Sequence, residues 1–180
     1  MGMAATIPYY TVQDLEQFPN DGNRYELLDG VLLVTPAPDA VHQAISARLI
    51  TALTVGAGAA AFVFGPGAIA FPPRTQLEPD ILVLPAKGLL TPRWQDYTEH
   101  WLAAEVLSPS SRLYDRDFKR DAYLALGVHQ VWLIDRDDRS VEISRANSAR
   151  VVVRDWLEWR VPTSATLVRI SLVDLFAGIG

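Results

Sequence analysis

Apolar and turn-forming residues alternate near the start of the chain in a way that predicts a β-hairpin. Residues 24–36 read RYELLDGVLLVTP, so that Asp29-Gly30 lies between two segments rich in apolar and strand-forming residues. Asp-Gly is a favoured pair for a two-residue hairpin turn. Upstream, Thr11 can cap a short helix that extends through Phe18, and a turn at residues 19–22 follows it.

The next segment has the period of a helix. Asp39 is a suitable N-cap, and the apolar side chains of residues 40–54 recur at helical spacing, with Arg48 as the polar member of the stripe. The apolar members are Val41, Ala44, Ile45, Leu49 and Ala52. One face of this helix should therefore pack on a sheet.

Short apolar segments dominate the middle of the chain. Four of them, AFVFG, AIAF, DILVLP and WLAAEVLS, are bounded by glycine, proline or polar turns, which is typical of strands buried on both faces. Residues 114–126 have helical periodicity, and Gly127 suits a left-handed C-terminal cap.

The last third of the chain is predicted to be mainly β-structure. VHQVWLID, SVEISR and ARVVVRD have strand patterns, and a short helix is expected around residues 172–176. The sequence thus predicts a mixed α/β fold in which helices flank a central sheet, with an added N-terminal β-hairpin and C-terminal antiparallel strands. No repeat or linker divides the chain, so residues 1–180 are expected to form one domain.

Composition narrows the functional classes. The chain has no cysteine, which excludes disulfides, thiolate metal sites and a cysteine nucleophile. Residues 49–73 carry no charge, yet glycine and proline interrupt them repeatedly, so we expect no membrane span. The start of the chain lacks the pattern of a signal peptide, and we therefore expect a cytoplasmic protein.

Two carboxylates occupy apolar surroundings. Asp80 begins the DILVLP segment directly after Pro79, and Glu105 lies between Ala104 and Val106. A buried carboxylate is normally paired, protonated or bound to a metal. If the two carboxylates bind a metal, oxygen ligands favour Mg²⁺ or Mn²⁺. The alternatives to a metal site are that Asp80 only forms a turn at the strand edge and that Glu105 is a core carboxylate paired with an arginine.

A lysine follows on the helix predicted at residues 114–126. At 100° per residue, Asp115 and Lys119 fall on one stripe with Phe118, Ala122, Ala125 and Leu126, whereas Arg116, Asp117, Arg120 and Asp121 fall on the opposite, solvated side. An ordinary i,i+4 ion pair is the simple explanation for Asp115 and Lys119. Their place on the apolar stripe instead favours a buried charge.

Several motifs together resemble a known family. The region AAEVLSPSSRLYDRDFKRDAYLALGVHQVWLID, together with RYELLDG, PAPDAVHQAIS and EPDILVLP upstream, is similar to the Uma-two family of restriction-endonuclease-like proteins. The resemblance covers most of the chain. Each motif is weak alone, but the set is specific.

The resemblance implies a PD-(D/E)XK nuclease core. Asp80 matches the metal-binding aspartate of that core, Glu105 matches the acidic residue that follows, and the backbone carbonyl of Val106 is a further implied ligand. The basic pattern places a lysine two residues after the glutamate, where this chain has Leu107. In this family the lysine is displaced to the next helix, and Lys119 matches it.

Other residues also match positions of the family. Glu26 is an implied accessory metal residue, with an ordinary strand glutamate as the alternative, and His42 is an implied accessory residue that could equally cap or pack its helix. Asp115 could orient Lys119. Ser108, Ser110 and Ser111 could contact phosphate, although a capping loop explains them as well.

The resulting hypothesis is a Mg²⁺- or Mn²⁺-dependent endonuclease that acts on DNA, in a homodimer whose two-fold symmetry would suit a duplex. The net charge of −5 and a pI near 5.1 argue against a nucleic-acid partner, whereas basic residues near the site, from Arg112 to Arg120, argue for one. The alternatives are a non-catalytic nucleic-acid-binding or protein-interaction module with the same fold, and a nuclease that acts on RNA.

Overall fold

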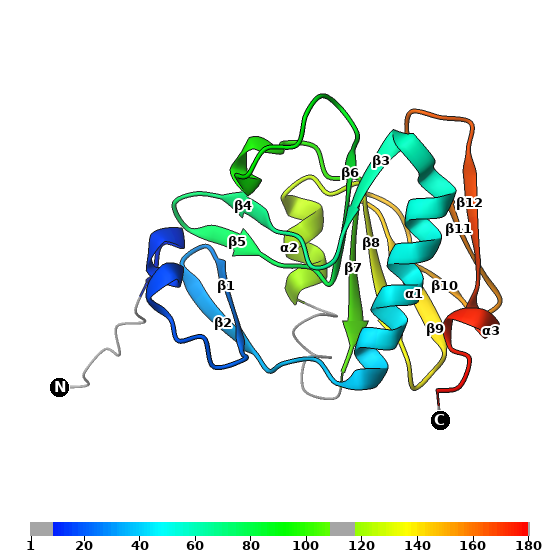
Figure 1. Cartoon of the computed structure of the whole chain (residues 1–180), viewed down its shortest axis with the longest axis horizontal. Helices are drawn as coiled ribbons and strands as arrows, with labels where there is room; N and C mark the ends of the chain where they lie inside the picture. The colour runs from blue at the N-terminus through cyan, green and yellow to red at the C-terminus, as the bar shows by residue number, and fades with distance from the viewer. Residues whose placement is uncertain (1–8, 109–117, 180) are drawn as a thin grey trace.

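A six-stranded mixed sheet forms the centre of the protein (Figure 1). The computed structural model describes residues 9–108 and 118–179. The strand order is β10-β9-β8-β7-β6-β3, in which β7 and β8 are parallel and the other neighbours are antiparallel. The strands are β3 (Ala61–Phe64), β6 (Ile81–Pro85), β7 (Leu102–Leu107), β8 (Gln130–Asp135), β9 (Ser140–Ser144) and β10 (Val151–Val153). The predicted fold class is confirmed.

A smaller antiparallel sheet carries the predicted hairpin. Its order is β2-β1-β5-β4, with β1 at Arg24–Leu28, β2 at Val31–Thr35, β4 at Ile69–Phe71 and β5 at Thr75–Leu77. Asp29 and Gly30 have φ angles of 50° and 83°, as the favoured hairpin turn requires. The preceding 3₁₀ helix η1 (Val12–Gln17) is capped by Thr11, whose backbone N–H and hydroxyl both donate to Asp14.

One long helix covers a face of the central sheet. Helix α1 (Ala40–Ala57) begins where predicted, because the Asp39 carboxylate accepts the backbone N–H of His42 at 2.8 Å. Its buried Ile45, Leu49 and Leu53 join a core that also contains side chains of the β11–β12 hairpin and of α3. These elements are β11 (Trp156–Arg160), β12 (Leu167–Ser171) and α3 (Leu172–Leu175), and the 3₁₀ helix η2 (Gly58–Ala60) ends α1.

The opposite face of the central sheet packs against α2 (Arg120–Ala125) and the smaller sheet. The 3₁₀ helix η3 (Trp94–Asp96) adds Trp94 to the edge of this second core. Side chains of a strand alternate between faces, and Ala103 and Leu107 of β7 belong to the core on this side. Glu105 lies between them in the alternation and therefore points toward α2. The buried carboxylate thus shares a face of the sheet with the helix that carries the lysine.

The helix containing Lys119 differs in phase from the prediction. Lys119 is buried as expected, but Arg120, predicted to be solvated, is also buried, and Phe118, predicted to be on the apolar stripe, is 44% exposed. Residues 118 and 119 form a π-helical turn, in which hydrogen bonds join residues i and i+5. Such a turn has more residues than an α-helical turn, so the side chains do not follow the 100° step assumed. Gly127 has the predicted left-handed φ, at 88°, whereas Asp115 lies outside the described residues.

Three of the five tryptophans, Trp101, Trp132 and Trp159, are buried in the core. Trp156 is 48% exposed and lies under the guanidinium of Arg169. Within the described residues, no helix is both long and apolar enough to cross a membrane.

His100, directly before β7, gives the fold an expected acid sensitivity. Its ring is buried, and its Nε2 has no hydrogen-bond partner among the described residues. Burial, with a smaller contribution from His129, lowers the pKa of His100 from 6.5 to about 4. The folded protein therefore binds fewer protons than the unfolded chain between these two values, and stability falls as the pH drops through this window.

We expect wild type to lose roughly 3 kcal/mol of unfolding free energy from this group between pH 7 and pH 4. Urea unfolding of His100→Leu across this range should show a shallower pH dependence. His129→Gln removes only the smaller contribution to the shift, so its pH dependence should lie between those of wild type and His100→Leu, closer to wild type. Equal slopes for wild type and His100→Leu would contradict the assignment.

Candidate active site

Asp80, the residue directly before β6, lies opposite Glu105 of the neighbouring strand β7. The register of β6 and β7 pairs Ile81 with Ala104, so one step further Asp80 is opposite Glu105. Directly opposed side chains in an antiparallel pair have Cβ atoms about 5 Å apart. The backbone N–H of Val106 also donates to Asp80 Oδ2 at 2.9 Å. The strand pairing therefore brings the two predicted carboxylates to one place.

Asp80 is surrounded by donors. His42 Nε2 lies 2.8 Å from Oδ2, and Arg24 Nη1 donates to Oδ1 at 3.0 Å. Burial by itself would raise the pKa of Asp80, but the contact with His42, the charge of Arg24 and the Val106 N–H outweigh it and lower the pKa to about 2. Asp80 is therefore ionised at neutral pH, the state in which a carboxylate binds a cation.

Glu105 is held from the helix side. Its Oε1 accepts the hydroxyl of Tyr123 at 2.6 Å and lies 3.4 Å from Nζ of Lys119. Both donors come from the same helical segment, four residues apart, and so lie one turn apart on one face. Tyr123 had no predicted role, although its spacing from Lys119 was a usable signal.

Glu26 completes the ionic cluster from the smaller sheet. Its Oε2 accepts from Lys119 Nζ at 2.6 Å, and its Oε1 accepts the backbone N–H of Glu78 at 2.7 Å. Glu26 is fully buried, and Lys119 is 2% exposed. Lys119 therefore lies between two carboxylates, one from each sheet.

Arg24 is a member of the site that the sequence did not single out. It is two residues before Glu26 on β1, so the alternation of a strand directs both side chains to the same face. Burial would lower the pKa of Arg24, but Asp80, Glu105 and Glu26 together raise it. The guanidinium thus lies in the electric field of all three carboxylates.

The predicted residues are not all brought together. Glu26, His42, Asp80, Glu105 and Lys119 converge, whereas Leu107, which has the position of the lysine in the basic pattern, is buried in the apolar core. Val106 contributes its N–H to Asp80. Asp115, Ser110 and Ser111 lie outside the described residues.

The carboxylate oxygens of the site could hold a hard divalent cation that takes few of its ligands from the protein. Three carboxylates face the guanidinium of Arg24 and the amino group of Lys119, and Asp80 is kept ionised. In the described part of the chain no three acidic or histidine side chains are grouped as a ready-made metal cage. Mg²⁺ usually keeps several waters and takes only one or two carboxylates plus substrate oxygens, so Asp80 and Glu105 could serve as its side-chain ligands.

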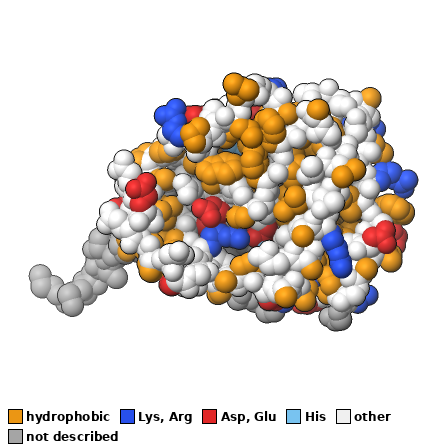
Figure 2. Space-filling view, viewed as in Figure 1, with side chains coloured by type: hydrophobic (Ala, Val, Ile, Leu, Met, Phe, Trp, Pro, Cys, Tyr) orange, Lys and Arg blue, Asp and Glu red, His pale blue; other side chains and the backbone are white. Residues whose placement is uncertain are grey.

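The site opens to the surface through a small hollow. A cavity of about 100 Å³ is lined by Arg24, His42, Ser46 and Asp80, among others. Figure 2 shows acidic and basic side chains side by side near the middle of one face of the molecule. Arg24, with a side chain 18% exposed, is therefore the member of the charged cluster nearest to solvent, whereas the side chains of Asp80, Glu105, Glu26 and Lys119 are buried.

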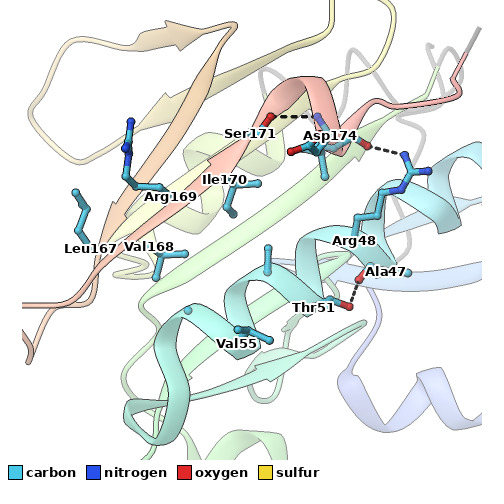
Figure 3. Close-up of a pocket in the computed structure, with 13 residues that line it drawn as sticks. Ala47, Arg48, Thr51, Val55, Leu167, Val168, Arg169, Ile170, Ser171 and Asp174 are labelled. Carbon is cyan, nitrogen blue, oxygen red and sulfur yellow. Dashed lines mark hydrogen bonds between the residues drawn. The ribbon is translucent and has the colours of Figure 1, made fainter.

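A wider groove lies elsewhere, between α1 and β12 (Figure 3). It has a volume of about 740 Å³, and its polar groups are mostly engaged with each other or with backbone. Arg48, for example, donates to the carbonyl oxygens of Leu175 and Ala177, and Thr51 donates to that of Ala47. This groove presents no convergent group for chemistry.

Comparisons with known proteins agree with the fold. A family model, Uma2, described as "Putative restriction endonuclease", matches residues 12–172. A crystal structure described as a putative nuclease belonging to DUF820 from Anabaena variabilis ATCC 29413 is similar, with a TM-score of 0.74 and 22% sequence identity. The similarity covers 93% of this chain and 97% of the other. No curated protein matched.

Proposed function

Because the chain belongs to the Uma2 family of restriction-endonuclease-like proteins, we propose that it is a Mg²⁺- or Mn²⁺-dependent endonuclease that hydrolyses phosphodiester bonds in DNA. The observation that carries this proposal is the pairing of Asp80 with Glu105 across two strands, with the buried ammonium of Lys119 beside Glu105. Two carboxylates and a lysine at one point match the requirements of metal-assisted phosphodiester hydrolysis.

Asp80 and Glu105 would hold the cation. When bound, the cation would lower the pKa of a water and neutralise charge at the scissile phosphate. His42 and the Val106 N–H orient Asp80, and Tyr123 orients Glu105. The backbone carbonyl of Val106 is the further ligand that the family resemblance implies.

Lys119 would act beside Glu105, at 3.4 Å from its Oε1. Its Nζ is positioned by Glu26 at 2.6 Å, which fixes the long side chain in one orientation. A desolvated ammonium interacts with developing negative charge more strongly than a solvated one. Lys119 is therefore suited to stabilise charge on the phosphate or to orient the attacking water.

A second candidate function is a non-catalytic nucleic-acid-binding module. The observation in its favour is that Arg24 and Lys119 already compensate much of the carboxylate charge, which reduces the need for a cation to neutralise it. RNA is a further candidate substrate, since nothing in the described site selects between the two sugars. The homodimer and the cytoplasmic location stay predictions.

The test is a substrate panel. Wild type is incubated with supercoiled plasmid, linear duplex DNA, single-stranded DNA and RNA, in Mg²⁺, in Mn²⁺ and in EDTA. We expect cleavage of DNA that requires the metal. Cleavage of RNA alone would favour the ribonuclease, and binding without cleavage of any substrate would favour the non-catalytic module.

A further inference from the structure

Arg24 is anchored by only part of its guanidinium. Nη1 donates to the carbonyl oxygen of Glu78 at 2.8 Å and to Asp80 Oδ1 at 3.0 Å. The remaining donors, on Nε and Nη2, have no hydrogen-bond partner among the described residues, although the side chain is only 18% exposed. The guanidinium is thus fixed in place while one of its edges still has donors to offer.

Two hollows meet at this side chain. The cavity of about 100 Å³ next to Asp80 and His42 lies against Arg24, and so does a groove of about 550 Å³ formed largely by residues around the N-terminal hairpin. The groove is large enough for a nucleotide, given that ligand pockets are commonly 300 to 1,000 Å³. Arg24 therefore stands between the carboxylate site and a groove of suitable size.

The groove has the chemistry of a site for a neutral nucleoside. Its wall includes the side-chain amides of Asn20, Asn23 and Gln76, which can donate and accept hydrogen bonds. Phe18 and Tyr25 also line it, with their rings stacked at a centroid distance of 4.9 Å. Amides and aromatic rings are the groups that contact base edges and faces in single strands.

The carboxylates of Glu16 and Glu78, which both line the groove, restrict where a phosphate can bind in it. Burial, followed by the nearby charge of Glu26, raises the pKa of Glu78. Even so, a phosphate would bind more favourably at the guanidinium of Arg24 than near the carboxylate of Glu78 further along the groove. A planar guanidinium with two parallel N–H groups matches two phosphate oxygens, which a lysine cannot reproduce.

We propose that Arg24 binds a backbone phosphate of the strand that is cut, and that the groove beside it receives the adjoining nucleoside. This inference rests on the proposed nuclease function and adds the residue that places the strand against Asp80 and Glu105. Arg24 is held ready by its Nη1 bonds, so little side-chain entropy is lost when the phosphate binds.

The experiment measures DNA binding separately from cleavage. Fluorescence anisotropy of short labelled single-stranded and duplex DNA is recorded in Ca²⁺ over a range of salt concentrations. The proteins are wild type, Arg24→Met, Arg24→Lys and Arg154→Met. Arg154 is an exposed arginine paired with Asp138, far along the chain from the site, and serves as the matched control.

We expect Arg24→Met to bind about 10- to 100-fold more weakly than wild type. The slope of log Kd against log salt should fall by about one, because one phosphate contact is lost. Arg24→Lys should keep the slope, because it keeps the charge, but bind more weakly than wild type. Arg24→Lys also keeps a positive charge near Asp80, so its weaker binding would reflect loss of the guanidinium and not loss of that charge.

Equal affinity and slope for Arg24→Met and Arg154→Met would overturn the inference, whether or not wild type cleaves DNA. If DNA binding depends on Arg24 but wild type cleaves nothing in Mg²⁺ or Mn²⁺, Arg24 is supported as a phosphate ligand and the proposed nuclease function is contradicted. Absence of DNA binding by wild type would overturn both.

Discussion

Replacing Lys119 with methionine is expected to lower the free energy of unfolding by about 3 to 5 kcal/mol, because it removes the positive charge between two buried carboxylates. Lys119 Nζ lies 2.6 Å from Glu26 and 3.4 Å from Glu105, and neither carboxylate is accessible to bulk water. Cleavage by the same variant should fall strongly as well. Chemical denaturation followed by circular dichroism measures the stability change.

Two companion variants separate the charge from the packing of Lys119. The double variant Glu26→Gln/Lys119→Met removes one of the two carboxylates and should recover part of the lost stability without recovering cleavage. Lys87→Met alters an exposed lysine that pairs with Glu99 and should change stability by less than about 1 kcal/mol. A Lys119→Met protein as stable as Lys87→Met would show that the buried ion pairs are not structurally important.

Loss of either central carboxylate is expected to reduce cleavage about 1,000-fold or more, since each would remove a ligand of the catalytic cation. Asp80→Asn and Glu105→Gln keep the size of the side chain while removing its charge. Asp80 accepts from Arg24, His42 and the Val106 N–H, so some of its packing survives the change. Mn²⁺ affinity, measured by calorimetry, should fall in both variants.

Exposed acidic residues provide the control for these variants. Glu158→Gln changes a carboxylate that pairs with Arg169 on the surface of β11 and should cleave like wild type. Retained helix and strand content in the circular dichroism spectrum establishes that lost activity is not lost folding. Glu158→Gln as inactive as Glu105→Gln would point to a general effect of net charge.

The sequence predicted the elements whose local signals are strong. The Asp29-Gly30 turn and the Asp39 cap each combine a residue preference with a backbone requirement, and both are found as expected. The strand that carries Glu105 was recognised from its apolar neighbours. Local preferences were sufficient at these places because the tertiary structure does not compete with them.

The phase of the helix that carries Lys119 needed more than periodicity. A regular 100° step placed Lys119 correctly but put Arg120 on the solvated side. Arg120 is in fact buried, because the π-helical turn at residues 118 and 119 departs from that regular step. Such a turn leaves no clear pattern in a short segment. The burial of Arg120 near Glu142 is a tertiary arrangement that only the fold reveals.

Arg24 and Tyr123 were missed for a related reason. Each is an ordinary residue type in its own segment, and its role depends on a carboxylate 56 or 18 positions away. Asp80 and Glu105 could be found because an isolated carboxylate in an apolar strand is unusual by itself. Partners that satisfy such a charge are fixed by sheet pairing and helix packing.

The most direct test of the proposed metal-dependent nuclease is single-turnover cleavage of a supercoiled plasmid as a function of Mn²⁺ concentration, with wild type and Glu105→Gln compared. The prediction is cleavage by wild type that EDTA abolishes, and a rate at least about 1,000-fold lower for Glu105→Gln at every Mn²⁺ concentration. Equal rates for the two proteins, or wild-type cleavage that persists in EDTA, would contradict it.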